Sequence, residues 1–118
     1  MAEQATRVKV RDLSGVSLVE FADRKILDEL CIHEIQEELA TLVDSSPVGN
    51  LLLSFKNVDH LSSAALGMLI TLKKQIEQKQ GKLKLSDINP QIYEVFKITR
   101  LNKIFDIHPS IDKARASF

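Results

Sequence analysis

Two adjacent serines, Ser62 and Ser63, are the residues of this chain whose types and position best support chemistry. They follow an apolar run at residues 50–55 that predicts a buried strand, and the leucines and isoleucines after them recur at helical spacing. We assign Ser62 as the helix cap, because a serine oxygen there accepts a hydrogen bond from a free backbone amide. Ser63 is then the first helical residue, at the positive end of the helix, where an anion such as a phosphate group is stabilised. By this geometry alone, the pair is an ordinary helix start.

The other nucleophilic and metal-binding residue types form no catalytic pattern. The serines lack the Gly-x-Ser-x-Gly turn of serine hydrolases, and His60 is too close in sequence to be a convincing partner base. His33 and His108 belong to no motif, and Cys31 lies on the apolar stripe of a predicted helix, where it is best interpreted as a small core residue. No His, Cys, Asp or Glu cluster has metal-ligand spacing, and no glycine-rich phosphate loop is present. We therefore expect a protein that is not an enzyme, with no catalytic residue, cofactor or metal.

Composition predicts a single domain over residues 1–118, with residues 1–6 flexible. A chain of 118 residues, 44% of them hydrophobic, should bury roughly 65% of its unfolded surface, enough for a core without disulfides. Sixteen basic and sixteen acidic residues give no net charge, which disfavours direct nucleic-acid binding. No apolar run approaches the roughly 20 residues of a membrane span. The start lacks the features of a secretory signal, and the single cysteine fits a reducing cytoplasm.

The first half of the chain predicts a hairpin followed by a long helix. Residues 7–11 alternate as a half-buried edge strand, residues 12–15 supply a turn, and residues 16–21 form a second strand. Residues 22–26 read as a polar connection. An amphipathic helix is predicted at residues 27–43, and turn residues follow it at 44–49. The apolar stripe of this helix contains Leu27, Leu30, Cys31, Ile35, Leu39 and Leu42.

The second half alternates strands with helices. The helix after the serines should reach about Gln80, where Gly81 ends it in a left-handed conformation. Residues 82–86 alternate as a strand, and Asn89 and Pro90 begin a third helix as cap and first-turn residue. A short strand at residues 104–107 and a short helix at 110–116, capped by Ser110, complete the chain. The third helix has an apolar side made of Ile92, Val95, Phe96 and Leu101.

This order of elements predicts an α/β domain with a mixed sheet of five short strands and about four helices. Residues 51–53 should lie at the centre of the sheet, between the strands around Leu18 and Leu83.

Around the paired serines the chain resembles the STAS domain, the module of anti-sigma-factor antagonists. Such proteins typically read Val-x-Phe-x-Asp-Ser-Ser-Gly-Leu-Gly where this chain reads Val58-Asp-His-Leu-Ser-Ser-Ala-Ala-Leu-Gly67. Val58, Ser63, Leu66 and Gly67 match, and Ser63 falls where the phosphorylated serine usually lies. The residues after 81 are similar to the second half of the family, so the resemblance covers nearly the whole chain. It implies a single STAS-like domain with the helices packed on one side of the sheet.

The chain departs from the family pattern beside the switch serine and at two further positions. Ser62 replaces the usual Asp and Ala65 the usual Gly, so a kinase that reads the missing charge would phosphorylate this protein poorly. The backbone should survive, because serine caps a helix about as well as aspartate. The first loop has Glu20-Phe-Ala-Asp23 for Gly-Glu-Leu-Asp, and the matching Asp23 is of a kind that often contacts a basic residue of the partner. Arg100 replaces a helix-ending glycine, so that turn should be remodelled.

The resemblance implies a cytoplasmic protein-binding switch. The unmodified form would bind an anti-sigma factor that is a serine kinase, phosphorylation of Ser63 would release it, and a serine phosphatase would reverse the modification. Any ATP would belong to the kinase, and the chain itself would be a monomer or weak dimer without nucleic acid or membrane contacts. The alternative, which Ser62 and Ala65 support, is a scaffold in a larger bacterial signalling assembly that is not phosphorylated.

The expected partner surface surrounds the serines. Leu61 and Met68 would be its apolar anchors if exposed, although at least one of them is expected to be core. Phosphate on Ser62 instead would exchange the roles of cap and switch between the two serines. The surface comprises Asp23, Asp59, His60, Leu61, Ser62, Ser63 and Met68.

Overall fold

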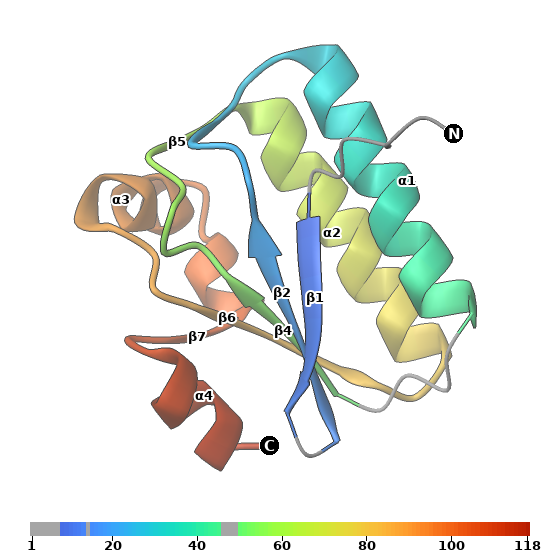
Figure 1. The fold of residues 1–118 in the computed structure, drawn as a ribbon. Helices are drawn as coiled ribbons and strands as arrows, with labels where there is room; N and C mark the ends of the chain where they lie inside the picture. The colour runs from blue at the N-terminus through green and yellow to red at the C-terminus, as the bar shows by residue number, and fades with distance from the viewer. Residues whose placement is uncertain (1–7, 14, 46–49) are drawn as a thin grey trace.

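A five-stranded mixed sheet forms the centre of the protein in a computed structural model, which describes residues 8–13, 15–45 and 50–118 (Figure 1). The first two strands pair as the predicted antiparallel hairpin, and three further strands continue in parallel from the second. The expected flexibility of residues 1–6, the strand start at Arg7 and most of the turn at 44–49 lie outside the described residues. In their order across the sheet, the strands are β1 (Val8–Leu13), β2 (Val16–Phe21), β4 (Asn50–Ser54), β6 (Lys82–Ser86) and β7 (Asp106–His108).

The strand registers confirm the predicted centre of the sheet. Leu52 of β4 pairs with Leu18 of β2 on one side and with Lys84 of β6 on the other. Because side chains alternate along a strand, Leu51 and Leu53 face one side of the sheet and Leu52 faces the other. An uninterrupted apolar run therefore gives the central strand two faces that must be covered.

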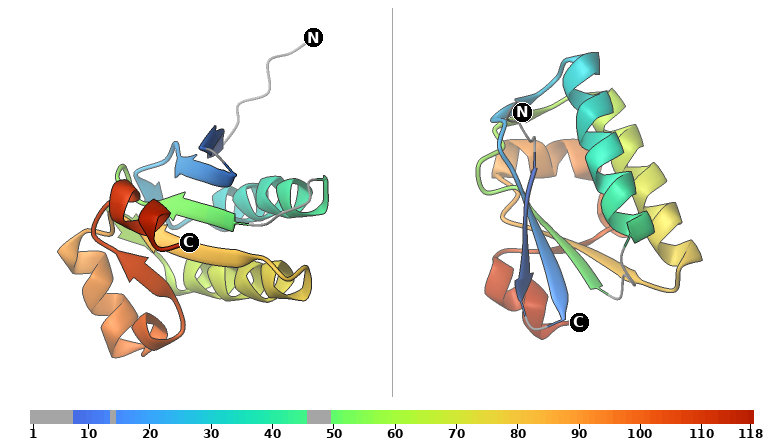
Figure 2. Two further views of the ribbon diagram at one scale, coloured as in Figure 1. Left: turned by 90° about the horizontal axis from the view of Figure 1, so that it is seen from below. Right: turned by 45° about the vertical axis from the view of Figure 1, so that its right-hand side comes forward.

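The helices cover these two faces unequally. Apolar side chains of α1, α2 and α3 join Leu51 and Leu53 in the main core. Helix α4 packs on the opposite face, where Ala114 joins Leu18 and Leu52 in a second, smaller cluster (Figure 2, right). The expectation that all helices lie on one side is therefore wrong for α4, because Leu52 needs a cover of its own. The helices are α1 (Glu29–Ser45), α2 (Ser63–Gln78), α3 (Pro90–Ile98) with the 3-10 helix η1 (Leu101–Lys103) after it, and α4 (Ile111–Ala116).

Side-chain caps determine where three helices begin. The Oγ of Ser62 accepts a hydrogen bond from Ala65 N at 3.2 Å, so α2 begins at the next residue, as predicted. Asn89 caps α3 in the same way, through a bond of 2.8 Å from Ile92 N to its Oδ1. Ser110 caps α4, which is also the predicted cap. These starts were predictable because each cap acts over only three residues.

Helix α1 begins two residues later than predicted. Asp28 caps it, since its Oδ2 accepts a hydrogen bond from Cys31 N at 3.1 Å. Leu27 lies before the cap and is 48% exposed, and Leu30 in the first turn is 60% exposed. Neither leucine belongs to the buried stripe, contrary to prediction. The buried stripe is Cys31, Ile32, Ile35, Leu39 and Val43, with Leu42 half-buried.

Two residues other than glycine take the left-handed conformation after helices. Gln80 does so with a φ of 63°, where Gly81 was predicted. Gln80 N then donates to Glu77 O and Gly81 N to Ile76 O, both at 2.9 Å, which closes α2 in a Schellman motif. Arg100, with the same φ of 63°, adopts the conformation that a glycine would take after α3, so the turn there is not remodelled.

The structure also corrects the predicted burial of Val10 and Val95 and the predicted start of the last strand. Val10 of β1 and Val95 of α3 are exposed, so β1 buries only Val8 fully and α3 relies on Ile92 and Phe96. The last strand begins at Asp106, two residues later than predicted, because the chain is still leaving η1 before that point.

Candidate functional site

A second, two-stranded sheet holds the segment that leads to the paired serines. Strand β3 (Lys25–Ile26) pairs in parallel with β5 (His60–Leu61), within what the sequence suggested was only a polar connection. Asp59 N and His60 N donate to Arg24 O at 2.7 and 3.1 Å, and Ser62 N donates to Ile26 O at 3.1 Å. The loop after β2 is thereby bound, residue by residue, to the segment before α2 (Figure 1).

The two serines occupy the two positions at the helix start that the sequence predicted for them. Ser62 is half-buried, and its oxygen is engaged as the helix cap. Ser63 is exposed as the first residue of α2, and its hydroxyl makes no hydrogen bond to any residue that the structure describes. The first turn of α2 contains no acidic residue. Ser63 can therefore carry a phosphate group at the positive end of a 16-residue helix without a neighbouring carboxylate in that turn.

Asp59 is held by a residue that sequence reasoning missed. Arg24 Nε donates to Asp59 Oδ2 at 3.1 Å, while the carbonyl of Arg24 accepts from the Asp59 amide. Both side chains are largely exposed, so the pair fixes geometry more than it stabilises the fold. No local pattern could have revealed this contact, because the two residues are 35 positions apart.

His60 and Leu61 border a shallow pocket of about 190 Å³ beside α3. Asn89, the α3 cap, also donates from Nδ2 to Val58 O at 3.2 Å and so fixes the helix to this segment. Leu61 is half-buried and packs on the main core, whereas His60 is exposed. Polar and apolar residues both line the pocket, namely Asp59, His60, Leu61, Gln91, Ile92 and Val95.

Asp23 lies in the same region but contacts a different helix. It is half-buried after β2, and Cys31 Sγ donates a hydrogen bond to its Oδ2 at 3.5 Å. Cys31 is 5% exposed, which confirms its assignment to the core. The contact with Asp23 was not foreseen, since it joins a loop to the second residue after the start of α1.

Met68 does not belong to the exposed surface. It is 5% exposed and lies in the main core, so its assignment as a partner contact is wrong. The reason is its helical position: Ala65 lies three residues before Met68 and Leu72 four residues after it, and both are buried. The structure exposes Leu27 and Leu30 instead, at the start of the neighbouring helix α1.

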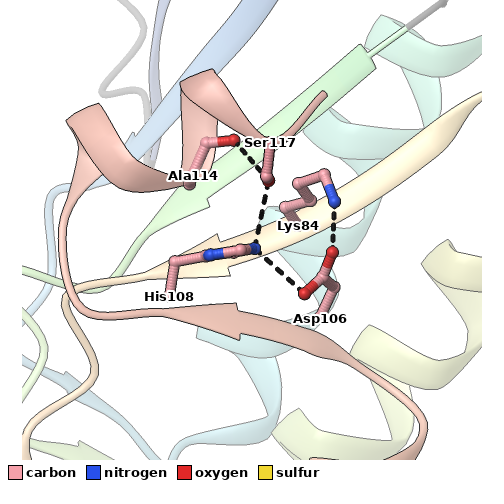
Figure 3. Close-up of polar contacts among 5 residues, drawn as sticks. All are labelled: Lys84, Asp106, His108, Ala114 and Ser117. Atoms are coloured by element: carbon pink, nitrogen blue, oxygen red, sulfur yellow. Dashed lines mark hydrogen bonds and ion pairs between the residues drawn. The ribbon is translucent and has the colours of Figure 1, made fainter.

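A second cluster of reactive residue types lies under α4 (Figure 3). His108 Nε2 is 2.9 Å from Asp106 Oδ1 and 3.2 Å from Ser117 Oγ. A Ser-His-Asp triad needs the carboxylate on one ring nitrogen and the serine on the other, whereas here both meet Nε2. Ser117 Oγ in turn donates to Ala114 O at 2.8 Å. The arrangement fastens α4 to β7 and does not activate the serine.

Lys84 completes this cluster from the adjacent strand. Its ammonium group pairs with Asp106 and lies 5.1 Å from the centre of the Phe118 ring. The hydrogen bond from Lys84 is the main reason that the pKa of Asp106 lies below its ordinary value of 3.8, with His108 adding to the effect and desolvation opposing it. The cluster is thus an electrostatically satisfied structural link between β6, β7 and α4.

Neither a metal centre nor a membrane span is found within the described ranges. No group of three His, Cys, Asp or Glu side chains there could hold a metal ion. No helix among these residues is long and apolar enough to cross a bilayer.

The known proteins that are similar to this chain in sequence or fold are STAS domain proteins and anti-sigma factor antagonists. The STAS domain family model matches residues 7–114. BtrV of Bordetella bronchiseptica, provisionally named an anti-sigma factor antagonist, is 34% identical over 86 residues, which cover 73% of each chain. The structure of a STAS domain protein from Planctomyces limnophilus superposes with a TM-score of 0.85 at 16% identity, covering 97% of this chain and 98% of that one. SpoIIAA of Bacillus in its phosphorylated form gives a TM-score of 0.70 at 13% identity, covering 93% and 97%.

Proposed function

Because this chain belongs to the STAS domain family, we propose that it is an anti-sigma-factor antagonist that works as a phosphorylation switch. In its unmodified form it binds an anti-sigma factor that is also a serine kinase. Phosphorylation of Ser63 by that kinase releases it, and a serine phosphatase restores binding. The chain acts in the cytoplasm through protein contacts alone, and any ATP is bound by the kinase.

The exposed hydroxyl of Ser63, which makes no hydrogen bond within the described part of the chain, is the observation that carries this proposal. A phosphate group there adds about −1.5 to −2 charges at neutral pH. The start of α2 stabilises such a charge, so the fold should persist. A close interface would instead have to accommodate a solvated dianion, and a loss of about 1.4 kcal/mol would weaken binding about tenfold. SpoIIAA, which shares the fold, has been seen in both phosphorylated and unphosphorylated forms.

The scaffold function remains the second candidate, because of one feature beside Ser63. Ser62 contributes no negative charge, and the nearest preceding carboxylate, that of Asp59, is paired with Arg24. A kinase that needs an acidic residue before its target would therefore leave Ser63 unmodified. In that case the same exposed surface would bind a partner permanently.

Titration of variants against the anti-sigma factor kinase of the same organism, with ADP or ATP present, tests the proposal. Ser63→Ala should bind like the wild type and should not be released by ATP. Ser63→Asp should fold normally but bind at least about tenfold more weakly. Ser110→Asp is the matched control, since it adds the same charge at the start of α4, where aspartate also caps well.

Two results would count against the switch. If Ser63→Asp binds as tightly as the wild type and ATP yields no phosphate on Ser63, the scaffold function replaces it. If site mapping by mass spectrometry finds phosphate on Ser62, the cap and switch roles of the two serines are exchanged.

A further inference from the structure

Helix α1 carries an unusual distribution of charge. Six of the sixteen acidic residues of the protein lie between Asp28 and Asp44, a segment without any lysine or arginine. The other ten acidic residues share the rest of the chain with all sixteen basic residues. A protein with no net charge thus presents one helix that is acidic along its length.

Two exposed leucines lie at the start of this acidic helix. Leu27 and Leu30 are among the most exposed large apolar residues of the described chain. Glu29, Leu30 and Glu37 are all exposed, and their spacing places them within one side of the helix. We name Leu27, Glu29, Leu30 and Glu37 the α1 patch.

Local helix physics explains only part of this pattern. Asp28 and Glu29 are favoured at a helix N-terminus, and Asp44 pairs with Lys79 of α2 at 3.7 Å. Glu37 lies in the middle of the helix, where the dipole has little effect, and its ion-pair partner is His33 at 3.2 Å. Neither the exposed leucines nor the missing lysines are accounted for by folding of α1.

The start of the α1 patch lies close to the switch serine. Helices α1 and α2 lie side by side and run in the same direction, so both begin at the same end of the domain (Figures 1 and 2). The amide of Ser62 donates to the carbonyl of Ile26 at 3.1 Å, and Leu27 is the next residue. A partner that covers Ser63 therefore meets Leu27 and the start of α1 in the same contact.

We propose that the α1 patch is a docking surface for a basic segment of the anti-sigma factor kinase. The segment would place an apolar side chain on Leu27 and Leu30, and lysine or arginine side chains opposite Glu29 and Glu37. The choice of occupant follows from charge complementarity, because a basic partner meets the carboxylates of a helix that has no lysine or arginine of its own. The inference rests on the proposed function. It adds a second contact surface, on α1, and predicts that the partner segment bound there is basic and carries an apolar side chain.

The structure supplies matched variants for a test with the full-length chain and the kinase in its ADP form. Leu30→Ala should weaken binding about tenfold, as expected for an anchor of an interface. Ile104→Ala is its control, because Ile104 is also half-exposed but lies beside Gly81 and Lys82, where the parallel strands begin. Glu37→Lys should slow association about threefold at low salt, and less at high salt. Its control is Glu77→Lys, since Glu77 likewise pairs with the residue four positions before it but lies near the far end of α2.

The outcomes separate this inference from the switch itself. Loss of affinity in Leu30→Ala and Glu37→Lys, with both controls unchanged, supports the α1 patch. If both patch variants bind like the wild type while Ser63→Asp does not, the patch is wrong and the switch stands. Equal losses of affinity in patch and control variants would also overturn the inference, since substitutions anywhere on the surface would then weaken binding. If the wild type binds no anti-sigma factor kinase, both the proposed function and the assignment of the α1 patch are wrong.

Discussion

Ser63 at the start of α2 and Ser117 at the end of α4 differ in whether their hydroxyl groups are held by neighbouring residues. Ser63 is exposed, and its hydroxyl contacts none of the residues described. Ser117 donates to Ala114 O and lies against His108, which contacts Asp106 (Figure 3). The first region leaves a reactive group available to a partner, whereas the second uses each of its groups to hold a helix in place.

The residue types of the α4 cluster resemble a catalytic set more closely than those around Ser63 do. Serine, histidine and aspartate meet under α4, but they share a single ring nitrogen and surround a structural ion pair. Among the described residues, the region around Ser63 contains no such set, and it offers a helix start with an exposed hydroxyl. Availability and geometry therefore separate a site from a structural link. The two regions should respond to mutation in opposite ways: the α4 cluster through stability and the switch through binding.

The largest expected effect on stability is at the α4 cluster. Lys84→Ala removes the ion pair with Asp106 and the contact with the Phe118 ring. We expect a loss of about 2 kcal/mol in the free energy of unfolding, less than for a fully buried pair because the Asp106 side chain is 49% exposed. Urea denaturation measures this loss, and affinity for the kinase should stay unchanged. Lys97→Ala, which breaks an exposed pair with Glu94, should cost less than about 1 kcal/mol. Equal losses in the two variants would contradict the structural role of the cluster.

A smaller contrast is expected within the switch itself. Ser62→Ala should lower the free energy of unfolding by about 1 kcal/mol, because the amide of Ala65 loses its cap. Ser63→Ala should change it by less than about 0.5 kcal/mol, because an exposed hydroxyl without a partner is removed. Thermal melts of the two variants, measured beside the wild type, give the comparison. If Ser63→Ala proves the more destabilising of the two, the assignment of cap and switch must be reversed.

The smallest expected effect is a dependence of stability on pH at the α4 cluster. The pKa of Asp106 is lower in the folded protein than its ordinary value of 3.8, because Lys84 donates to the charged carboxylate. Its contribution to stability is therefore complete above that value and is lost as the pH falls through the lower folded-state pKa. The difference in urea midpoint between the wild type and Asp106→Asn should narrow as the pH falls below 3.8. A difference that is constant down to acid pH would show that the charge of Asp106 does not contribute.

The sequence determined the features that depend on neighbours within a few residues. Caps at Ser62, Asn89 and Ser110 were predicted correctly because each one joins a side chain to an amide three positions away. The strand alternation and the apolar run of β4 likewise predicted the sheet, and the helical spacing after the serines placed Ser63 at the helix start.

Only the tertiary structure decided which apolar residues are buried and which distant segments meet. Helix α1 has apolar residues around about half of its circumference, so its periodicity fits more than one buried stripe, and packing against α2 and the sheet selected Ile32 and Val43 over Leu27 and Leu30. The burial of Met68 in α2 follows instead from its helical spacing to the buried residues Ala65 and Leu72. The pairing of β3 with β5 and the contact of Arg24 with Asp59 join residues about 35 positions apart. Such contacts form only once the sheet has brought both segments to the same end of the domain, and no local pattern in the chain encodes that position.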